Sequence, residues 1–345
     1  MGYGAFGVGS NRVGLHYGAD YTTGFGTYRD NKGDWLLVLT NNAIYSVQLD
    51  PTDDFRITDA IGTGCVSQRA FVSLGIDSGD AVYLSQFGIH SLRQSQQYGA
   101  KEDKFLSWKI RQTMKTLNIS RLKYAVGAHD SQNGRVVFAV PTGSSTSNDT
   151  LLVLDTKGSN SLNADNAKWY IWRISGVSIN ELLYARDASD NWHLYAGTTT
   201  GDVLRFSDDA FNDLDAAYQS ELQTAHNDLG SLLIRKTLGP IMVTLQPGGN
   251  YRPTMKFIFD YGQNISTSRQ LSMKAPGGSL LGVGLLGGFM LGTAEVTRNE
   301  KVYGAGSGRT IGFNISHTGA DEPYRVGKID YLVAGMGQDA GDAAA

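Results

Sequence analysis

Carboxylates are the residues of this chain whose clustering could support chemistry. Nine of them crowd one stretch: Asp187, Asp190, Asp202, Asp208, Asp209, Asp213, Asp215, Glu221 and Asp228. A glycosidase needs only two placed acids, one to protonate the leaving group and one to act as base or nucleophile. The spacing here singles out no such pair, and no Asp-x-Asp/Asn-x-Asp/Asn-Gly calcium loop occurs. We therefore interpret these acids as solvated turn residues.

Other chemical motifs are equally sparse. None of the six histidines lies within five residues of another, and no HExxH, Gly-x-Ser-x-Gly or phosphate-binding loop occurs. Gly-x-Gly-x-x-Gly is found at Gly2–Gly7 and Gly282–Gly287, but neither run opens a helix within a βαβ unit. Cys65 is the only cysteine, which excludes an intrachain disulfide and a thiolate zinc site. We predict no cofactor, no metal and no enzymatic activity.

Paired apolar runs predict a series of β-hairpins. Residues 35–40 and 44–49 flank the turn-forming pair Asn41-Asn42, and the same form recurs at 81–85 with 89–92, at 135–140 with 151–155, and at 193–196 with 203–206. Equivalent strands lie roughly 45 to 57 residues apart, the spacing of four-stranded propeller blades. The sequence favours an all-β, propeller-like array of short antiparallel strands. An ordinary all-β sandwich with irregularly spaced hairpins is the alternative.

The rest of the chain divides around this array. Residues 1–30 are predicted to form a Gly-rich N-terminal arm, 31–235 the propeller-like domain, 236–335 a C-terminal β-sandwich domain and 336–345 a flexible tail. Strict alternation of apolar residues at 241–245, 255–261, 311–315 and 329–333 supports the sandwich. Near-helical spacing predicts one short amphipathic helix within 101–117. Residues 208–227 fit either a helix or a polar strand.

Charge is segregated within a chain of net charge −3. Residues 101–123 hold seven basic and two acidic residues, a net of +5, and residues 202–228 hold seven acidic and one basic residue, a net of −6. Such patches can orient neighbouring subunits or line an aqueous passage. The candidate interface residues are Lys101, Lys104, Lys109, Arg111 and Lys115. The candidate channel-facing residues are Asp202, Asp208, Asp209, Asp213 and Asp215.

An uncharged, Gly-rich segment at 277–292 is the third feature. Its apolar side chains are Leu280, Leu281, Leu285, Leu286, Phe289 and Met290. Frequent glycine disfavours a spanning helix, so we expect a loop or hairpin that a partner covers. A plain buried pair of strands is the alternative. High glycine, 43 residues, together with only 18% charged residues, also suits a surface that is buried in an assembly.

Several runs resemble phage tail-hub proteins, also called tail-stabilisation or nozzle proteins. The runs are Gly64–Gly75 followed by Asp80–Leu92, then Ala139–Asp155, and in the last third Phe289–Gly292 and Gly308–Ile315. The resemblance covers roughly residues 35–335 and rests on strand and turn patterns. It implies a sixfold ring of this chain beneath the portal or adaptor proteins, which extends the DNA channel and anchors tail fibres or a needle.

These observations give three function classes. The first is a structural ring of a virion tail, assembled in the host cytoplasm, through which genome DNA passes without specific binding. The second is a propeller that binds a host carbohydrate as a receptor-binding tail module. The third is a propeller enzyme that cleaves a surface polysaccharide. A binding module should carry exposed aromatic clefts, and an enzyme should carry two carboxylates about 5–10 Å apart in a pocket.

Overall fold

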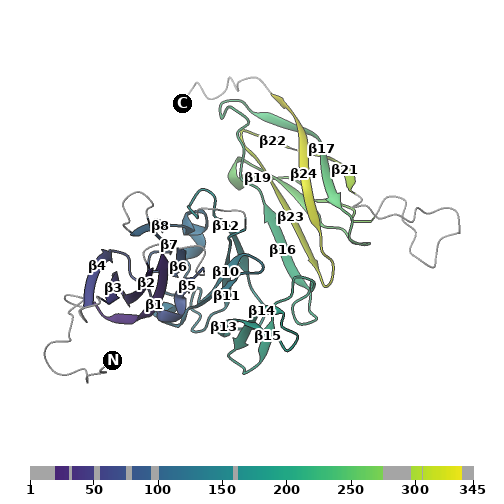
Figure 1. Cartoon of the computed structure of the whole chain (residues 1–345). Coiled ribbons are helices and arrows are strands. Elements are labelled where there is room, and N and C mark those ends of the chain that lie inside the picture. Colours follow the sequence, from purple (N-terminus) through teal and green to yellow (C-terminus); the bar gives the residue numbers. More distant parts are fainter. Residues whose placement is uncertain are drawn as a thin grey trace. The chain divides into compact units, whose positions relative to one another are not determined.

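Strands dominate the computed structural model, as the sequence predicts. It describes residues 20–30, 33–49, 55–74, 80–94, 101–157, 162–274, 297–304 and 306–335. The chain divides into two compact units, Met1–Ser207 and Asp208–Ala345 (Figure 1). Within the described ranges, no helix is long and apolar enough to cross a membrane.

The first unit is a succession of antiparallel sheets, which we call blades 1 to 4. Each strand pairs with the next one in the chain. Blade 1 contains β1 (Thr22–Asp30), β2 (Gly33–Thr40), β3 (Ile44–Leu49) and β4 (Phe55–Ile61); blade 2 contains β5 (Phe71–Ser73), β6 (Asp80–Leu84), β7 (Ile89–Gln94) and β8 (Lys101–Phe105). Blade 3 contains β9 (Val126–Asp130), β10 (Arg135–Val140), β11 (Thr150–Asp155) and β12 (Lys168–Trp172); blade 4 contains β13 (Ile179–Arg186), β14 (Trp192–Thr198) and β15 (Val203–Arg205).

All four predicted hairpins are confirmed, each as the second and third strands of a blade. The registers close at Leu39↔Ile44, Leu84↔Ile89, Val140↔Thr150 and Gly197↔Val203. First strands of consecutive blades also contact one another, β1 with β5, β5 with β9 and β9 with β13. This is the arrangement of propeller blades around their inner strands, so the all-β, propeller-like prediction is confirmed.

Separate apolar clusters fill the spaces between neighbouring blades. Blades 1 and 2 meet at Leu37, Leu39 and Tyr83, and blades 2 and 3 meet at Leu84 and Phe138. Blades 3 and 4 meet in a third cluster that includes Val137, Ala139, Leu194 and Ala196. Because successive residues of a strand point to opposite faces, Phe138 packs toward blade 2 and its neighbours in β10 pack toward blade 4. The middle blades are therefore buried on both faces, which explains their uninterrupted apolar runs.

The predicted amphipathic helix is present but shorter than 101–117. Residues 101–105 form β8, because their backbone pairs with β7, for example Phe105 with His90. Helical turns follow as η2 (Ser107–Ile110) and α1 (Arg111–Met114), and η3 (Ile119–Tyr124) leads into blade 3. Ile110 and Met114, four residues apart, pack against the core between blades 2 and 3. Strand pairing therefore overrides the helical spacing at the start of the segment.

The second unit is a two-sheet sandwich, as predicted. One sheet contains β16 (Tyr218–Gln223), β23 (Ile311–Gly319), β18 (Thr254–Phe259), β19 (Asn264–Ile265) and β20 (Arg269–Gln270); the other contains β21 (Arg298–Tyr303), β17 (Lys236–Gln246), β22 (Ser307–Gly308) and β24 (Arg325–Gly335). A 3-10 turn, η4 (Asp260–Gly262), follows β18. One cluster joins the sheets, with Ile241 and Val243 of β17 against Phe257 of β18 and Phe313 of β23.

Two boundaries differ from those drawn on the sequence. Thr22–Asp30, predicted as part of an arm, is the first strand of blade 1 because it pairs with β2 along its length. The sandwich unit begins at Asp208 rather than at 236, since β16 pairs with β23 from Tyr218↔Gly319 to Gln223↔Asn314. The ambiguous stretch 208–227 therefore contains a strand and no helix.

Candidate functional site

A polar pocket lies at one end of blades 2, 3 and 4. In an antiparallel meander, the start of the first strand and the loop between the second and third strands lie at the same end. Arg69 of η1 (Gln68–Ala70) precedes β5, and Asn180 lies at the start of β13. Thr199 belongs to the β14–β15 turn. The cavity volume is about 270 Å³.

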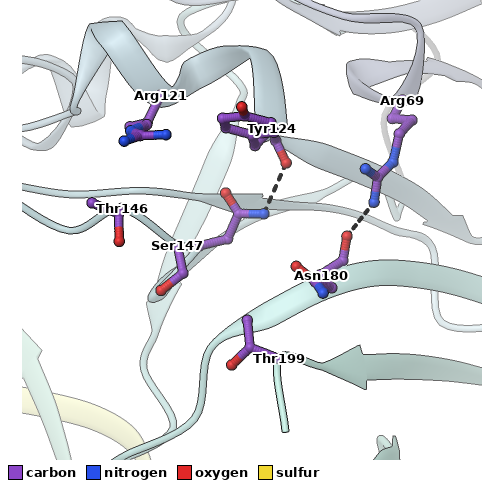
Figure 2. A pocket seen from close by; sticks show the side chains of 8 residues that line it. Arg69, Arg121, Tyr124, Thr146, Ser147, Asn180 and Thr199 are labelled. Carbon is purple, nitrogen blue, oxygen red and sulfur yellow. Dashed lines mark hydrogen bonds between the residues drawn. The ribbon is translucent and has the colours of Figure 1, made fainter. Parts of the chain in front are cut away.

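Blade 3 supplies the rest of the lining. Arg121 and Tyr124 come from η3, and Thr146, Ser147 and Asn148 come from the long β10–β11 loop. Figure 2 shows Arg121 and Tyr124 on one side of the cavity, with Asn180 and Thr199 on the opposite side. Hydroxyl, amide and guanidinium groups line the pocket, and none of the described lining residues is a carboxylate.

Hydrogen bonds between blades hold the pocket walls in place. The Asn148 side-chain amide donates to the carbonyl oxygens of Tyr124 and Ile179, at 2.9 Å each. The Ile179 amide in turn donates to the Asn148 carbonyl oxygen at 2.8 Å. Arg69 donates to the Asn180 carbonyl oxygen (Figure 2) and lies 2.5 Å from the Glu181 carboxylate. Because these bonds join blades 2, 3 and 4, the pocket is preformed.

Charge and unmet hydrogen bonding distinguish two of the lining residues. Glu181 offsets the charge of Arg69, whereas the half-buried Arg121 makes no ion pair in the part of the chain that the structure describes. The Arg121 guanidinium lies 5.9 Å from the centroid of the exposed Tyr124 ring. Asn148 is only 4% exposed, and its side-chain oxygen finds no hydrogen-bond donor among the described residues. The pocket thus offers a cation and an exposed aromatic ring, while the Asn148 oxygen is buried in its wall.

The predicted acidic residues belong to both units of the structure. Asp202 lies in the β14–β15 turn of blade 4, where its carboxylate accepts from the Thr200 hydroxyl at 2.8 Å. Asp208, Asp209, Asp213 and Asp215 belong to the second unit. Asp213 exchanges backbone hydrogen bonds with Ala216, and burial raises the pKa of its carboxyl group. These residues occupy turns, and their assignment to a channel stays a prediction.

The predicted basic residues are spread over blade 2 and the turns after it. Lys101 and Lys104 belong to β8, Lys109 to η2 and Arg111 to α1, and Lys115 follows α1. Lys109 donates to the carbonyl oxygens of Asp165 and Ala167 at 2.6 and 3.1 Å, so it joins η2 to the segment before β12. The Arg111 guanidinium lies 4.6 Å from the Trp108 ring centroid. Their role at a subunit interface stays a prediction.

The apolar segment 277–292, with Leu280, Leu281, Leu285, Leu286, Phe289 and Met290, lies outside the described residues. Elsewhere in the described ranges, no group of three or more His, Cys, Asp and Glu side chains could hold a metal ion. Cys65 is buried against blade 1, and burial raises the pKa of its thiol to about 12. The thiol therefore does not supply a nucleophile at neutral pH.

Among known proteins, the chain matches solved structures at low similarity. No family model and no curated protein matches the chain. A match is the exo-β-1,3-galactanase from Phanerochaete chrysosporium with β-1,3-galactotriose, at 9% identity and a TM-score of 0.30, over 89% of this chain and 81% of that one. Another is a family 43 arabinoxylan arabinofuranohydrolase from Bacillus subtilis in complex with cellotetraose, at 10% identity and a TM-score of 0.25, over 89% and 66%.

These matches contradict the prediction that the chain is not an enzyme, because the solved structures are glycoside hydrolases. We withdraw that prediction. The identity is 8–10% and the TM-scores are 0.25–0.30, so the substrates and reactions of these hydrolases are not assigned to this chain.

Proposed function

We propose that this chain is a structural subunit that assembles with copies of itself, and that the assembly is part of a phage tail. The observation that carries the proposal is the outer surface of the two end blades. Blade 1 leaves Phe25 and Leu36 exposed at 53% and 42% on the face away from blade 2. Blade 4 leaves Leu183 and Val203 exposed at 59% and 73% on the face away from blade 3.

The outer faces of blades 1 and 4 carry apolar side chains of the same types that are buried between blades elsewhere in the first unit. Every inner blade face packs against the next blade through side chains of the same types. In a contact between two copies, blade 4 of one copy would pack against blade 1 of the next copy, as consecutive blades pack within one chain. Such a head-to-tail contact generates a ring when its rotation closes. Large apolar patches left exposed would otherwise favour aggregation.

The phage-tail part of the proposal is supported by the residues that carry the resemblance. Gly64, at the start of the first run, leads into blade 2, and a Cβ there would lie 2.2 Å from the backbone carbonyl of Asn41. Gly88, in the second run, forms the β6–β7 turn, where a Cβ would lie 2.4 Å from the Phe105 ring. Two residues of the runs that carry the resemblance are thus ones that the blade structure requires.

Assembly can be tested on the purified chain by analytical ultracentrifugation over a range of concentrations. We expect a closed oligomer for the wild-type chain and a monomer for Leu183→Asp. Phe87→Asp is the matched control, because Phe87 is 77% exposed in the β6–β7 turn and lies on neither end face. A monomeric wild-type chain at high concentration would refute self-assembly. Electron microscopy of the purified particle tests the tail: the chain should form a ring on the tail axis.

A second candidate is a carbohydrate-binding module, and the pocket on blades 2 to 4 favours it. Preformed sites with a few converging polar groups and an exposed aromatic ring suit sugars, which present both hydroxyl groups and an apolar ring face. Saturation-transfer NMR of the chain with host surface saccharides tests this function. Transfer to no saccharide would exclude it and would leave the assembly proposal untouched.

A further inference from the structure

The pocket carries chemistry for one class of sugar, and we propose that it binds an acidic sugar unit, a pyranose that bears a carboxylate, of a surface polysaccharide. The inference rests on the carbohydrate-binding function given above as the second candidate. Three features of the lining support it: the charge of Arg121, the exposed Tyr124 ring with hydroxyl groups around it, and the size of the cavity.

Arg121 selects for an anion. Its guanidinium is half-buried in the cavity wall and forms no ion pair in the described part of the chain, while the other arginine of the pocket is paired with Glu181. An unpaired guanidinium in a preformed site binds a carboxylate through charge-assisted, often bidentate hydrogen bonds. None of the described lining residues is a carboxylate that would repel such a ligand, and the charge of the neighbouring Glu181 is paired with Arg69.

Asn148 positions the lining rather than the ligand. Its side-chain nitrogen donates to the carbonyl oxygens of Tyr124 and Ile179, so the amide orientation is fixed. Its oxygen is buried and has no donor among the described residues. The β10–β11 loop is thereby held against η3 and blade 4 before a ligand binds.

The remaining lining suits a sugar ring better than a bare anion. The Tyr124 ring is exposed and provides an apolar surface for the C–H face of a pyranose. Ser147 and Thr199 add hydroxyl groups from blades 3 and 4. A volume of about 270 Å³ is close to the lower end of ligand sites, about 300–1,000 Å³, and so fits one sugar unit.

The test uses the full chain, with glucuronic acid and N-acetylneuraminic acid as acidic probes, glucose as the neutral control and inorganic phosphate as the bare anion. Binding is measured by saturation-transfer NMR and titration calorimetry. We expect at least one acidic sugar to bind at least about 10-fold more tightly than glucose or phosphate. Arg121→Gln should weaken that binding roughly 10- to 100-fold, because a charge-assisted hydrogen bond is lost.

Lys168→Gln is the matched control, since it removes one positive charge from an exposed residue of β12 that does not line the pocket. It should leave the affinity within about twofold, a salt-screened effect at most. Unchanged thermal unfolding of both variants shows that they are folded. Equal binding of acidic and neutral sugars would overturn the inference but keep the carbohydrate-binding function. Binding of phosphate as tight as that of the acidic sugars would also overturn it, and binding of no probe would overturn both.

Discussion

Replacement of Phe138 by alanine should unfold the first unit at a lower temperature and leave the second unit unchanged. The Phe138 side chain is fully buried in the core between blades 2 and 3. Its ring lies over Gly127 of the adjacent strand, where a Cβ would lie 2.8 Å from a ring carbon. Glycine at 127 and phenylalanine at 138 therefore fill one space together, and alanine at 138 would leave a cavity.

The size of the effect follows from this burial. Phe→Ala substitutions in closely packed cores cost about 3–5 kcal/mol, because apolar contacts are lost and the cavity collapses only in part. For a unit of about 200 residues, each kcal/mol shifts Tm by about 2–4 °C. We therefore expect Tm of the first unit to fall by roughly 6–20 °C.

Tryptophan fluorescence measures this unit alone. All five tryptophans, Trp35, Trp108, Trp169, Trp172 and Trp192, lie in the first unit, and none lies in the second. Far-UV circular dichroism reports on the strands of both units. Phe138→Ala should lower the midpoint temperature of the fluorescence transition. In the dichroism signal, it should lower the midpoint only of the transition that belongs to the first unit.

Phe257→Ala is the matched control, because Phe257 is fully buried in the core of the second unit. It should lower a dichroism transition and leave the fluorescence transition within about 1 °C. If both variants moved the fluorescence transition equally, the two units would unfold as one. That result would refute the argument that each unit has its own core.

Three further outcomes are expected in the first unit. Gly64→Ala should cost about 1–3 kcal/mol in urea unfolding, since its Cβ would overlap the Asn41 backbone, whereas Gly62→Ala, with open space, should change little. Cys65 should resist thiol reagents at pH 8.5 until the chain unfolds, because burial raises the pKa of its thiol to about 12. Rapid labelling of Cys65 in the folded chain would contradict this. Burial lowers the pKa of His129 below 6.5, partly offset by the neighbouring aspartate. The folded state therefore binds this proton less readily than the unfolded state, so stability is lost as pH falls below about 6.5, and His129→Gln should reduce that loss.

The sequence was most informative where strands are buried on both sides. Residues 81–84 and 136–140 read as uninterrupted apolar runs because one set of side chains faces the preceding blade and the other faces the following blade. The first strands were harder to predict. β5 has only three residues, and β9 contains Gly127, whose missing side chain makes room for Phe138. The apolar pattern of β9 is interrupted at Gly127 because the Phe138 side chain of the paired strand β10 fills the space there.

The helical prediction was partly wrong for a related reason. Phe105, Trp108 and Met114 are spaced as on one helix, yet Phe105 lies in a strand that completes blade 2, and Trp108 is exposed. Periodicity alone cannot tell a helix from a strand followed by helical turns. The backbone of residues 101–105 gains pairing with β7, which an isolated helix would forgo.

The pocket could not be predicted from spacing, because its residues are far apart in the chain and are of types that also form turns. Arg69 and Thr199 are 130 positions apart, and only the contacts of inner strands bring their segments to one end of the unit. One residue of the pocket, Arg121, does lie in the basic stretch 101–123 that the sequence singles out. The positive net charge of this stretch agrees with the acidic ligand that we propose, but it does not give the position of the pocket. Lys109 and Arg121 differ in their contacts: Lys109 donates to backbone carbonyl oxygens of its own chain, whereas Arg121 makes no ion pair with the described residues.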